Sequence, residues 1–431
     1  MTQRAEVDRC PGVLRPHRAA DGALFRLRLP GGELNAPTLD IVSRAATRYA
    51  DGALQLTSRA NLQLRGVATD DPGAVHPGLV DEIVRAGLLP HPRHERVRNI
   101  VCSPLTGRRG GHADLRPLLL ELDDRLCSTE QLAGLPGPFL FVLDDGRGDV
   151  MSKAGDLGVV ATDTRTARLV LGGLPVGPAT PIAGAADALI GLALRFLDLA
   201  AGGPGRWHVR DLPDGGGELL TDAQGQPHAE PPLPTRPAVV DLGAIEQDDG
   251  RVLVSTLVPL GLLTGEQAAA LVRAAGSGTG ELVVTPWRGV VVPDLPTAAA
   301  AVAIRELAAA GLGVDDGTVW RGLTACTGAP RCTSGRGDTR ALATRIATGR
   351  GSSAASGDPA TPVHVVGCDR RCGSPSGAHV EVLADGDRAV VRGVANDGCD
   401  PARSAPTAVR AVDAAAAAIR ADLNAVEAGE R

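Results

Sequence analysis

An internal repeat constrains the fold of this chain more than any other feature of its sequence. From Ala23 the apolar pattern predicts a strand, a helix, two short strands and a second helix, at residues 24–29, 36–50, 53–57, 61–65 and 75–86. The same order returns in the second half, at 252–257, 264–274, 282–285, 289–292 and 297–310. Any two segments of this kind look alike in a chain rich in Leu and Val. We nevertheless predict a duplication, because order and spacing both hold, with Leu34, Gly52, Leu54 and Thr57 returning as Leu262, Gly280, Leu282 and Thr285.

Each copy of the repeat is followed by a second α/β segment. The first, about 93–199, predicts helices at 114–126 and 185–199 and strands at 139–143, 157–160 and 168–171. The second, about 320–430, predicts strands at 363–366, 378–383 and 389–394, a Gly/Ser-rich loop at 349–361 and an Ala-rich helix at 406–426. Residues 202–237 are dense in Gly, Pro and Asp and predict a linker with loops. Glu266 is expected to complete a capping box with Thr264. The predicted class is α+β, built from two related halves.

The composition limits the classes of function. A net charge of -6 and a pI near 5.9 argue against a general nucleic-acid binder, and with 2% aromatic residues the core must be aliphatic. No apolar run approaches the roughly 18 residues needed to cross a bilayer, and residues 1–18 are polar and charged, so we expect a cytoplasmic protein. Lys153 is the single lysine, so nearly all the basic side chains are arginines. The planar guanidinium group of arginine binds carboxylates in a bidentate manner.

Four of the eight cysteines form a spaced set, Cys326-x5-Cys332 followed by Cys368-x3-Cys372. A disulfide framework is not expected in a cytoplasmic chain of this length, so the spacing favours metal ligation or redox chemistry. Small residues beside the thiolates leave backbone amides close to the sulfurs, as a [4Fe-4S] cluster requires. Zinc and four unrelated buried thiols are the alternatives, and the spacing is unusual for zinc. We expect the other four cysteines to be small buried side chains or spare thiols: Cys10, Cys102, Cys127 and Cys399.

Three segments together resemble one known superfamily. They are Leu56-Thr57-Ser58-Arg59-Ala60-Asn61-Leu62-Gln63, Arg98-Asn99-Ile100-Val101-Cys102 and the cysteine set. The chain resembles the sulfite and nitrite reductases, and the resemblance covers nearly its whole length. It implies a ferredoxin-like half-domain at 1–90, followed by a reductase-type α/β domain without a cluster at 91–201. After a linker at 202–237, it implies a second ferredoxin-like half-domain at 238–312 and a second reductase-type α/β domain, with a 4Fe-4S cluster, at 313–431. In the reductases one cluster cysteine, here Cys372, couples the cluster to sirohaem.

Within this superfamily the chain most resembles the precorrin-3B synthases of aerobic cobalamin biosynthesis. The opening Cys10-Pro11-Gly12, the stretch from Asp21 to Gly32 and Thr285-Pro286-Trp287-Arg288 are similar to that family. The reductases also carry a Leu-Pro-Arg-Lys-Phe-Lys stretch, whose lysines supply charge and protons. The matching residues 135–140 read Leu-Pro-Gly-Pro-Phe-Leu, so sulfite or nitrite reduction is not expected. One departure is Asp369-Arg370-Arg371 between the last two cluster cysteines, where the superfamily has small residues; these cations either raise the cluster potential or face an anionic substrate.

The resemblance implies an oxygen-dependent hydroxylation and lactone formation on a reduced tetrapyrrole, precorrin-3A. Its partners would be dioxygen and an electron donor, an NADH-linked reductase or a ferredoxin. Arginines would hold the tetrapyrrole carboxylates, first Arg59, Arg98 and Arg288, with Arg65 and Arg321 nearby. A mononuclear non-haem iron would accompany the cluster, and His91 and His94 are the only closely spaced His pair. No catalytic residue is assigned.

Two other functions remain open at this point. The first is a sirohaem-dependent sulfite or nitrite reductase with altered active-site cations. The second is a non-catalytic iron-sulfur electron carrier or tetrapyrrole-binding protein.

Overall fold

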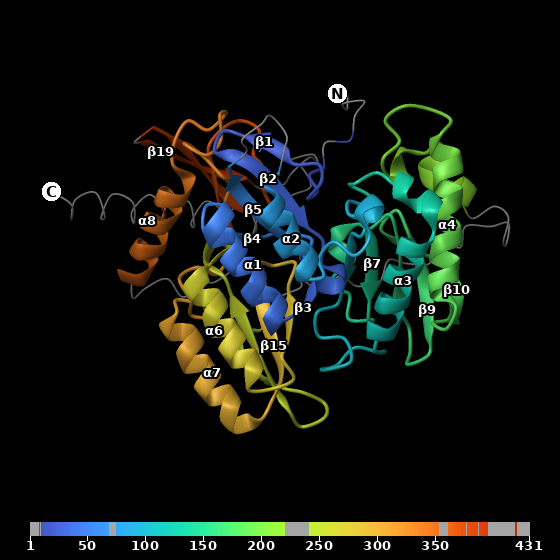
Figure 1. Cartoon of the computed structure of the whole chain (residues 1–431), viewed down its shortest axis with the longest axis horizontal. Coiled ribbons are helices and arrows are strands. Elements are labelled where there is room, and N and C mark those ends of the chain that lie inside the picture. Colours follow the sequence, from blue (N-terminus) through green and yellow to red (C-terminus); the bar gives the residue numbers. More distant parts are fainter. Residues whose placement is uncertain are drawn as a thin grey trace. The chain divides into compact units, whose positions relative to one another are not determined.

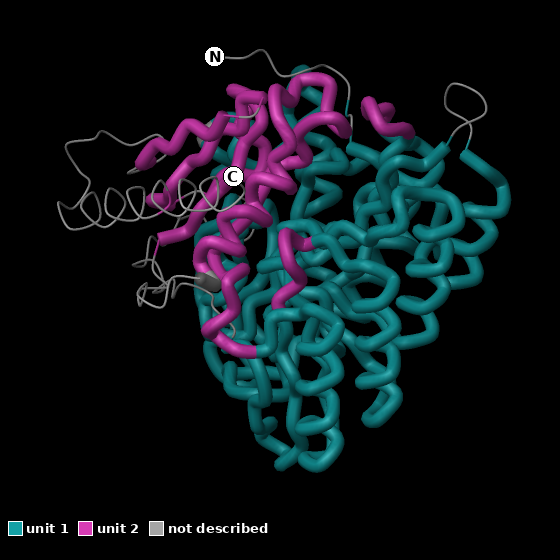
Figure 2. The backbone as a smooth tube through the Cα atoms, turned by 90° about the vertical axis from the view of Figure 1, so that its left-hand side faces the viewer, with its two compact units in different colours: residues 1–17, 23–256, 262–314 teal, residues 18–22, 257–261, 315–431 magenta. Residues whose placement is uncertain are grey.

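The computed structural model describes Asp8, residues 10–68, 75–219, 241–352, 361–375, 377–386 and 388–394, and Ile419. The chain divides into two compact units (Figure 2). Unit 1 comprises residues 1–17, 23–256 and 262–314, and unit 2 comprises residues 18–22, 257–261 and 315–431. No helix in the described part of the chain is long and apolar enough to span a membrane.

The duplication predicted from the sequence is confirmed by the order of the elements. The first copy contains β2 (Gly22–Leu27), β3 (Glu33–Asn35), α1 (Ala36–Tyr49), β4 (Ala53–Leu56), β5 (Leu62–Val67) and α2 (Pro77–Arg85). The second copy contains β12 (Val252–Leu257), β13 (Leu262–Thr264), α6 (Gly265–Gly276), β14 (Glu281–Val284), β15 (Gly289–Leu295) and α7 (Thr297–Ala309). In both copies a short 3-10 turn precedes the second strand, η1 (Pro30–Gly32) and η7 (Pro259–Gly261).

The equivalent helices of the two copies begin at side-chain caps. The Asn35 side chain accepts a hydrogen bond from the Thr38 amide at the start of α1. At the start of α6, Thr264 and Gln267 form a reciprocal capping box. The expectation that Glu266 would make this contact is wrong, because the capping partner must stand three residues after the cap and Gln267 holds that position.

The two copies exchange one strand each, which the sequence did not predict. One sheet has the order β1-β2-β5-β4-β13, where β1 is His17–Ala19, and the other has the order β11-β12-β15-β14-β3, where β11 is Gly243–Glu246. Leu34 of the first copy therefore pairs with Leu282 of the second, and Leu263 of the second pairs with Leu54 of the first. Helices α1 and α6 pack against each other (Figure 1). The half-domains thus share both sheets.

The first α/β segment is a five-stranded mixed sheet in unit 1. Strands β6 (Ile100–Cys102), β7 (Phe141–Asp144) and β8 (Leu157–Ala161) run parallel, and β9 (Thr166–Leu171) and β10 (Leu174–Pro181) add antiparallel hairpins. Helices α3 (Arg116–Ser128) and α4 (Ala185–Ala200) pack against each other beside it (Figure 1). Its core contains Phe139, Phe141 and Phe196, in ring contact. Strand β10 was not predicted, because Gly and Pro interrupt its apolar pattern.

The second α/β segment repeats this plan in unit 2. Strands β16 (Leu323–Ala325), β17 (Val363–Val366) and β18 (His379–Asp385) are parallel, and β19 (Arg388–Val394) is antiparallel to β18. Helix α8 (Thr339–Ser352) packs on this sheet and buries Ala343 and Ile346. The sequence did not predict α8, whose last turns fall where a Gly/Ser-rich loop was expected. The helix predicted at 406–426 lies outside the described residues, except for Ile419.

The segment predicted to be a linker begins as part of the unit 1 core. Three residues of this segment are buried in the core of the first α/β segment: Val209, Leu212 and Leu219. Val209 lies in the short 3-10 turn η5 (Val209–Asp211), Leu219 lies in the turn η6 (Pro213–Leu219), and Leu212 joins the two turns. The Asp156 carboxylate accepts a hydrogen bond from the Val209 amide at 2.9 Å and lies 3.0 Å from His208 Nδ1. Residues 202–219 are therefore packed chain, and residues 220–240 lie outside the described part.

Candidate functional site

The structure brings the four spaced cysteines together in unit 2. Cys326 follows β16, Cys332 lies in the next loop, and Cys368 and Cys372 lie in the loop after β17. All four are free thiols, and Cys372 is exposed. Burial raises the pKa of the Cys372 thiol, and the three other thiols of the set raise it further. The three other thiols therefore lie in the neighbourhood of Cys372.

Backbone and side-chain hydrogen bonds fix the first cysteine of the set. The Gly367 amide donates to Cys326 Sγ at 3.2 Å, and the Cys326 amide donates to the Val365 carbonyl at 2.9 Å. The buried Thr339 hydroxyl, at the start of α8, donates to the Cys326 carbonyl at 2.7 Å. Hydrogen bonds to the ligating sulfurs are a feature of iron-sulfur sites.

Three glycines allow the two cysteine loops to approach closely. A Cβ atom on Gly335 would lie 2.5 Å from the Ala329 amide nitrogen, and one on Gly328 would lie 2.4 Å from the Thr339 hydroxyl. A Cβ on Gly367 would lie 3.3 Å from Gly328 Cα. A side chain at Gly328 or Gly335 would therefore displace the loop, and Gly367 is in tight contact, so the small residues noted in the sequence have a packing role.

Polar partners hold the second cysteine loop to the sheet. His364 lies 3.1 Å from the Cys372 carbonyl through Nε2 and 2.7 Å from the Thr324 hydroxyl through Nδ1. Arg371 Nε lies 2.8 Å from the buried Glu381 carboxylate, and Asp369 pairs with Arg336 at 2.5 Å. Asp369 and Arg371 of the unusual insert thus have partners within unit 2, which gives them a structural role.

The sulfur spacing bears on the choice between zinc and a larger cluster. Within the described part of the chain, the one group of three or more His, Cys, Asp or Glu ligand atoms lying within 4.8 Å of one another is made of aspartates. No three of the four sulfurs are therefore that close. A zinc ion would hold its sulfurs about 3.8 Å apart, given Zn–S bonds of about 2.3 Å. The donor set, four thiols with an amide at one sulfur, fits the wider 4Fe-4S cluster.

A second group of residues, in unit 1, consists of Arg26, Arg28 and Arg59, which we call the arginine cluster. Arg26 and Arg28 alternate at the end of β2, so they project on one side of the sheet. Arg59 lies in the turn between β4 and β5, where the Thr57 hydroxyl accepts hydrogen bonds from the Arg59 and Asn61 amides. The Asn61 side chain accepts one from the Leu29 amide at 2.8 Å and ties this turn to β2.

The arginine cluster is a concentration of positive charge without carboxylate partners. No carboxylate of the described residues forms an ion pair with these three guanidinium groups, and Arg28 is only 2% exposed. Burial lowers the pKa of all three, and that of Arg28 falls to about 9, with Arg26 and Arg59 contributing by repulsion. Arg28 Nε and Nη1 and Arg26 Nε are buried without a hydrogen-bond partner. Such a group favours a bound anion.

Arg98 was predicted to bind a substrate carboxylate, but in the structure it is paired with a carboxylate of the protein itself. Its guanidinium donates two hydrogen bonds to the Asp123 carboxylate, from Nε to Oδ1 at 2.8 Å and from Nη2 to Oδ2 at 2.6 Å. Burial lowers the pKa of Arg98, but the contact with Asp123 outweighs it and raises the pKa above its usual value. Arg28 and Arg98 both line a pocket of about 430 Å³, together with Arg108, which binds Glu281 at 2.6 Å. Of these three arginines, only Arg28 lacks a carboxylate partner among the described residues.

The remaining predicted arginines occupy different settings. Arg65 is buried on β5, with 8% exposure. Arg321 lies in unit 2 and pairs with Asp316. Arg26 and Arg28 were not predicted as site residues, although their alternation with the apolar Leu27 in the sequence could have indicated a charged strand face.

Arg288 and Lys153 form a second pair of cations in unit 1. Arg288 takes a left-handed conformation, with φ of 63°, in the tight turn between β14 and β15. The Thr285 hydroxyl accepts a hydrogen bond from the Gly289 amide at 3.1 Å and closes this turn. Burial lowers the pKa of Lys153 to about 8, and the neighbouring Arg288 lowers it as well. The chain that follows Lys153 is held to Leu140, whose carbonyl accepts a hydrogen bond from the Asp156 amide at 2.7 Å.

Because Lys153 is the only lysine, its titration can be followed by chemical labelling. We expect the rate of its modification by an amine-reactive reagent to rise with a midpoint near pH 8, against about 10.4 for an ordinary lysine. Peptide mass spectrometry separates Lys153 from the amino terminus. Arg288→Ala should move the midpoint upward, since it removes a like charge. A midpoint above pH 10 in the unmodified protein would contradict the burial of this amine.

His91 and His94, the pair considered for a mononuclear non-haem iron, lie in different environments. His94 is 5% exposed and its Nε2 lies 3.1 Å from the Thr129 carbonyl, while His91 is exposed. Their ring centroids lie 6.3 Å apart, edge to face. No group of two His and one carboxylate within 4.8 Å is found in the ranges that the structure covers. His91 and His94 therefore do not fit as a ligand pair.

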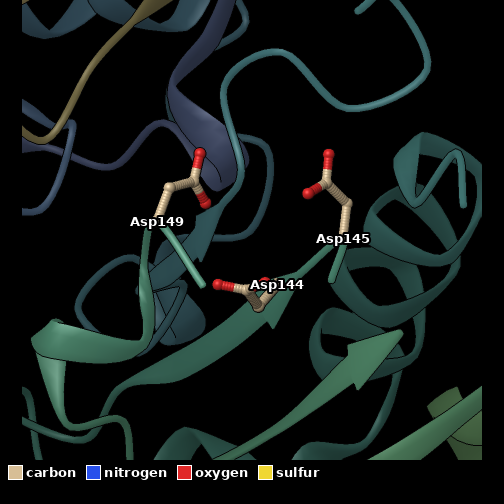
Figure 3. A group of neighbouring side chains, drawn as sticks. All are labelled: Asp144, Asp145 and Asp149. Atoms are coloured by element: carbon tan, nitrogen blue, oxygen red, sulfur yellow. The ribbon is translucent and has the colours of Figure 1, made fainter. Parts of the chain in front are cut away.

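Three buried aspartates gather at the end of β7 and in the loop that follows it: Asp144, Asp145 and Asp149 (Figure 3). Asp144 accepts hydrogen bonds from the Gly146, Gly148 and Val150 amides, and Asp145 binds both forks of Arg147. Asp149 accepts a hydrogen bond from the Ser103 hydroxyl at 2.6 Å, and burial raises its pKa to about 7. These contacts account for the group as the framework of its loop.

Comparison with known proteins agrees with the fold and the repeat. The family model of the nitrite/sulfite reductase ferredoxin-like half domain matches twice, at residues 15–79 and 245–310. A ferredoxin–nitrite reductase of Synechococcus elongatus is 27% identical over 394 residues, which cover 84% of this chain and 76% of that protein. A precorrin-3B synthase of Sinorhizobium sp. is 25% identical over 401 residues, which cover 90% and 83%. The structure of Mycobacterium tuberculosis NirA matches with a TM-score of 0.69 at 19% identity, over 89% of this chain and 79% of that one.

The chain therefore contains two copies of the nitrite/sulfite reductase ferredoxin-like half domain, each followed by an α/β segment. Over most of its length it is similar both to a nitrite reductase and to a precorrin-3B synthase.

Proposed function

We propose that this chain catalyses the oxygen-dependent conversion of precorrin-3A to precorrin-3B in aerobic cobalamin biosynthesis. The reaction adds one atom of dioxygen across a double bond of the tetrapyrrole. One carbon receives this atom as a hydroxyl group, and its neighbour bonds to the carboxylate oxygen of an acetate side chain, which closes a lactone and passes its proton to the hydroxyl, so the net gain is one oxygen atom. The second oxygen atom leaves as water, so two electrons and two protons must come from a donor, an NADH-linked reductase or a ferredoxin. The similarity to a precorrin-3B synthase over 90% of the chain supports this proposal.

The absence of cations from the stretch at residues 137–140 is the observation that carries the proposal. Reductases resembling this chain have lysines in the matching stretch. Here Leu140 is 3% exposed and packs in an apolar group with Val142 and Met151. A Cβ on Gly137 would lie 2.6 Å from Cys10 Cβ, so no longer side chain fits at that position. A stretch without cations at the position of the reductase lysines does not supply the proton donors that a six-electron reduction needs.

The arginine cluster matches the carboxylates of the proposed substrate. Precorrin-3A bears acetate and propionate groups, and planar guanidinium forks bind such groups in a bidentate manner. Arg26, Arg28 and Arg59 can hold and orient these groups, because none of the three has an ion-pair partner among the described carboxylates. Arg288 would bind a further carboxylate from its fixed turn.

The cysteines would hold the cluster that the proposed reaction needs. Cys326, Cys332, Cys368 and Cys372 fit as its ligands, with the Gly367 amide on Cys326. A bound 4Fe-4S cluster would supply electrons one at a time. The loop glycines and Thr339 keep the ligands in place, and the arginines position the substrate.

Absorption and oxygen uptake of the anaerobically purified protein test this function. We expect a broad cluster shoulder without a Soret band, and oxygen uptake only when precorrin-3A and a reduced donor are both present. The lactone product is detected by mass spectrometry as a gain of one oxygen atom. Absence of substrate-dependent uptake in a cluster-loaded protein would overturn the proposal.

A sirohaem-dependent nitrite or sulfite reductase is the second candidate. The 27% identity to a ferredoxin–nitrite reductase favours it, as does the Lys153–Arg288 pair, which places two cations in unit 1 despite the neutral stretch at 137–140. Sharp Soret and red bands, with steady reduction of nitrite or sulfite by a reduced dye without oxygen, would establish this function instead.

A further inference from the structure

A histidine and a buried aspartate form a hydrogen-bonded pair at one edge of the sheet in the first α/β segment. Asp156 immediately precedes β8, and His208 immediately precedes η5. The His208 Nδ1 atom lies 3.0 Å from Asp156 Oδ2 and 3.2 Å from Oδ1. Because an ionised carboxylate only accepts hydrogen bonds, Nδ1 carries a proton in this pair, which we call the His208–Asp156 dyad.

Backbone amides hold both members of the dyad in place. The Leu140 amide donates a hydrogen bond to Asp156 Oδ2, and the Val209 amide donates one to Oδ1, each at 2.9 Å. The Asp156 side chain is almost fully buried. The Asp211 carboxylate accepts a hydrogen bond from the His208 amide at 3.0 Å and fixes the turn that presents the ring. The imidazole therefore has a defined orientation.

The second ring nitrogen of His208 is open to a ligand. Among the described residues no hydrogen-bond partner is found for Nε2, and 13% of the side chain is exposed. An imidazole with Nδ1–H on a carboxylate and an open Nε2 is arranged to exchange protons with a neighbouring group.

The dyad adjoins the stretch in which this chain lacks the lysines of the reductases. Leu140 occupies the position of the second of these lysines, and two backbone hydrogen bonds join it to Asp156. Its amide donates to the Asp156 carboxylate, and its carbonyl accepts from the Asp156 amide at 2.7 Å. Since β6, β7 and β8 run parallel, the residues that precede them lie along one edge of the sheet.

The same edge is joined to the turn that carries Arg59. The Asn99 carbonyl, before β6, accepts a hydrogen bond from the Phe141 amide at 2.9 Å. The Asn61 side chain, two residues after Arg59, donates one to the Asn99 side chain at 3.5 Å. These contacts connect the turn of the arginine cluster to the edge at which the dyad lies.

The charges near Arg59 agree with this arrangement. Burial has the largest effect on the pKa of Arg59 and lowers it, while Asp156 raises it and Arg210 lowers it further. The charged groups around the His208 ring are therefore Asp156 before β8, Asp211 and Arg210 of η5, and Arg59 of the turn between β4 and β5.

We propose that His208 is the proton donor of the proposed reaction and that Asp156 is its positioning residue. This inference rests on the proposed function, in which one oxygen atom of dioxygen leaves as water after receiving two electrons and two protons. The NADH-linked reductase or ferredoxin supplies the electrons. His208 Nε2 passes one proton to the leaving oxygen atom, regains a proton from solvent and passes the second. Asp156 stays ionised and stabilises the imidazolium form.

His208→Asn separates proton transfer from anchoring. The Asn side-chain amide can donate to Asp156 from the position of Nδ1, but it does not titrate. In the cluster-loaded protein we expect the rate of lactone formation to fall at least about 100-fold, with the KM for precorrin-3A within about threefold of the native value. His17→Asn, at an exposed position of β1, is the matched control and should react at the native rate.

The dependence of the rate on pH gives a second readout. Because the protonated imidazole is the donor, the native rate should fall as the pH rises through the titration of His208. His208→Asn should lose this dependence. In His208→Ala, added imidazole should restore part of the rate, which a purely structural role of the ring would not allow.

Nitrogen NMR of the full-length protein with ¹⁵N-labelled histidine tests the dyad without turnover. The signals of His208 are those that disappear in His208→Asn. We expect the neutral ring to carry its proton on Nδ1. A proton on Nε2 would show that Asp156 does not orient the ring for transfer, and would overturn the inference.

The remaining outcomes separate this inference from the proposed function. If His208→Asn forms the lactone at the native rate and with the native pH dependence, or if imidazole restores nothing to a folded but inactive His208→Ala, the dyad only anchors the chain and the proposed function stands. If the native protein does not convert precorrin-3A in the presence of dioxygen and a reduced donor, both proposals fail.

Discussion

Replacing any one of Cys326, Cys332, Cys368 or Cys372 by Ala should remove the broad iron-sulfur absorption and lower the thermal stability of unit 2. Each thiolate would supply one bond to the proposed cluster, and metal binding contributes directly to the free energy of folding. The cluster would also connect the loops after β16 and β17, which otherwise meet through Gly328, Gly335 and Gly367. Iron and acid-labile sulfide assays, together with thermal unfolding, measure both effects.

Cysteines outside this set provide the matched controls. Cys102→Ala, Cys127→Ala and Cys399→Ala should retain full iron and sulfide. Cys102 and Cys127 lie in unit 1 and are buried, and Cys399 lies outside the described residues. Loss of the cluster from Cys102→Ala, or its retention in Cys372→Ala, would show that the ligand assignment is wrong.

Arg28→Met should raise the free energy of unfolding of the ligand-free protein. It should also weaken the binding of uroporphyrin III, a stable tetrapyrrole with carboxylates on every ring, by more than about tenfold. A buried cation without a counter-charge destabilises the fold, so an apolar side chain of similar length should add about 1–3 kcal/mol. The lost bidentate contact to a carboxylate accounts for the weaker binding. Urea unfolding measures the stability, and fluorescence quenching measures the binding.

Arg98→Met is the matched comparison, because Arg98 lines the same pocket as Arg28 but is already paired. This substitution leaves Asp123 without its partner and should lower the free energy of unfolding by roughly 1–3 kcal/mol. The two substitutions should therefore change stability in opposite directions. If Arg28→Met destabilises the protein as much as Arg98→Met does, the arginine cluster is compensated within the fold and is not poised for an anion.

The general plan of the molecule could be predicted from the sequence because its signals are local. The apolar periods of β2, α1 and β5 return in β12, α6 and β15, so the repeat was visible without any knowledge of contacts. The spacing of the cluster cysteines was equally local, since each pair lies within one loop. Helix α8 was not predicted because Gly349 and Gly351 weaken its pattern, and the packing of its buried face on β16 and β17 stabilises it instead.

The site in unit 1 was decided by tertiary structure. Arg28 and Arg98 look equivalent as sequence letters, but Asp123 lies against one and no described carboxylate pairs with the other. Cys10 was interpreted as an isolated thiol, because its neighbour Gly137 is distant in the chain. The sequence by itself determined the repeated architecture and the local cysteine loops. Only the tertiary structure decided the exchange of β3 and β13 and which charges are paired, because these depend on contacts between residues far apart in the chain.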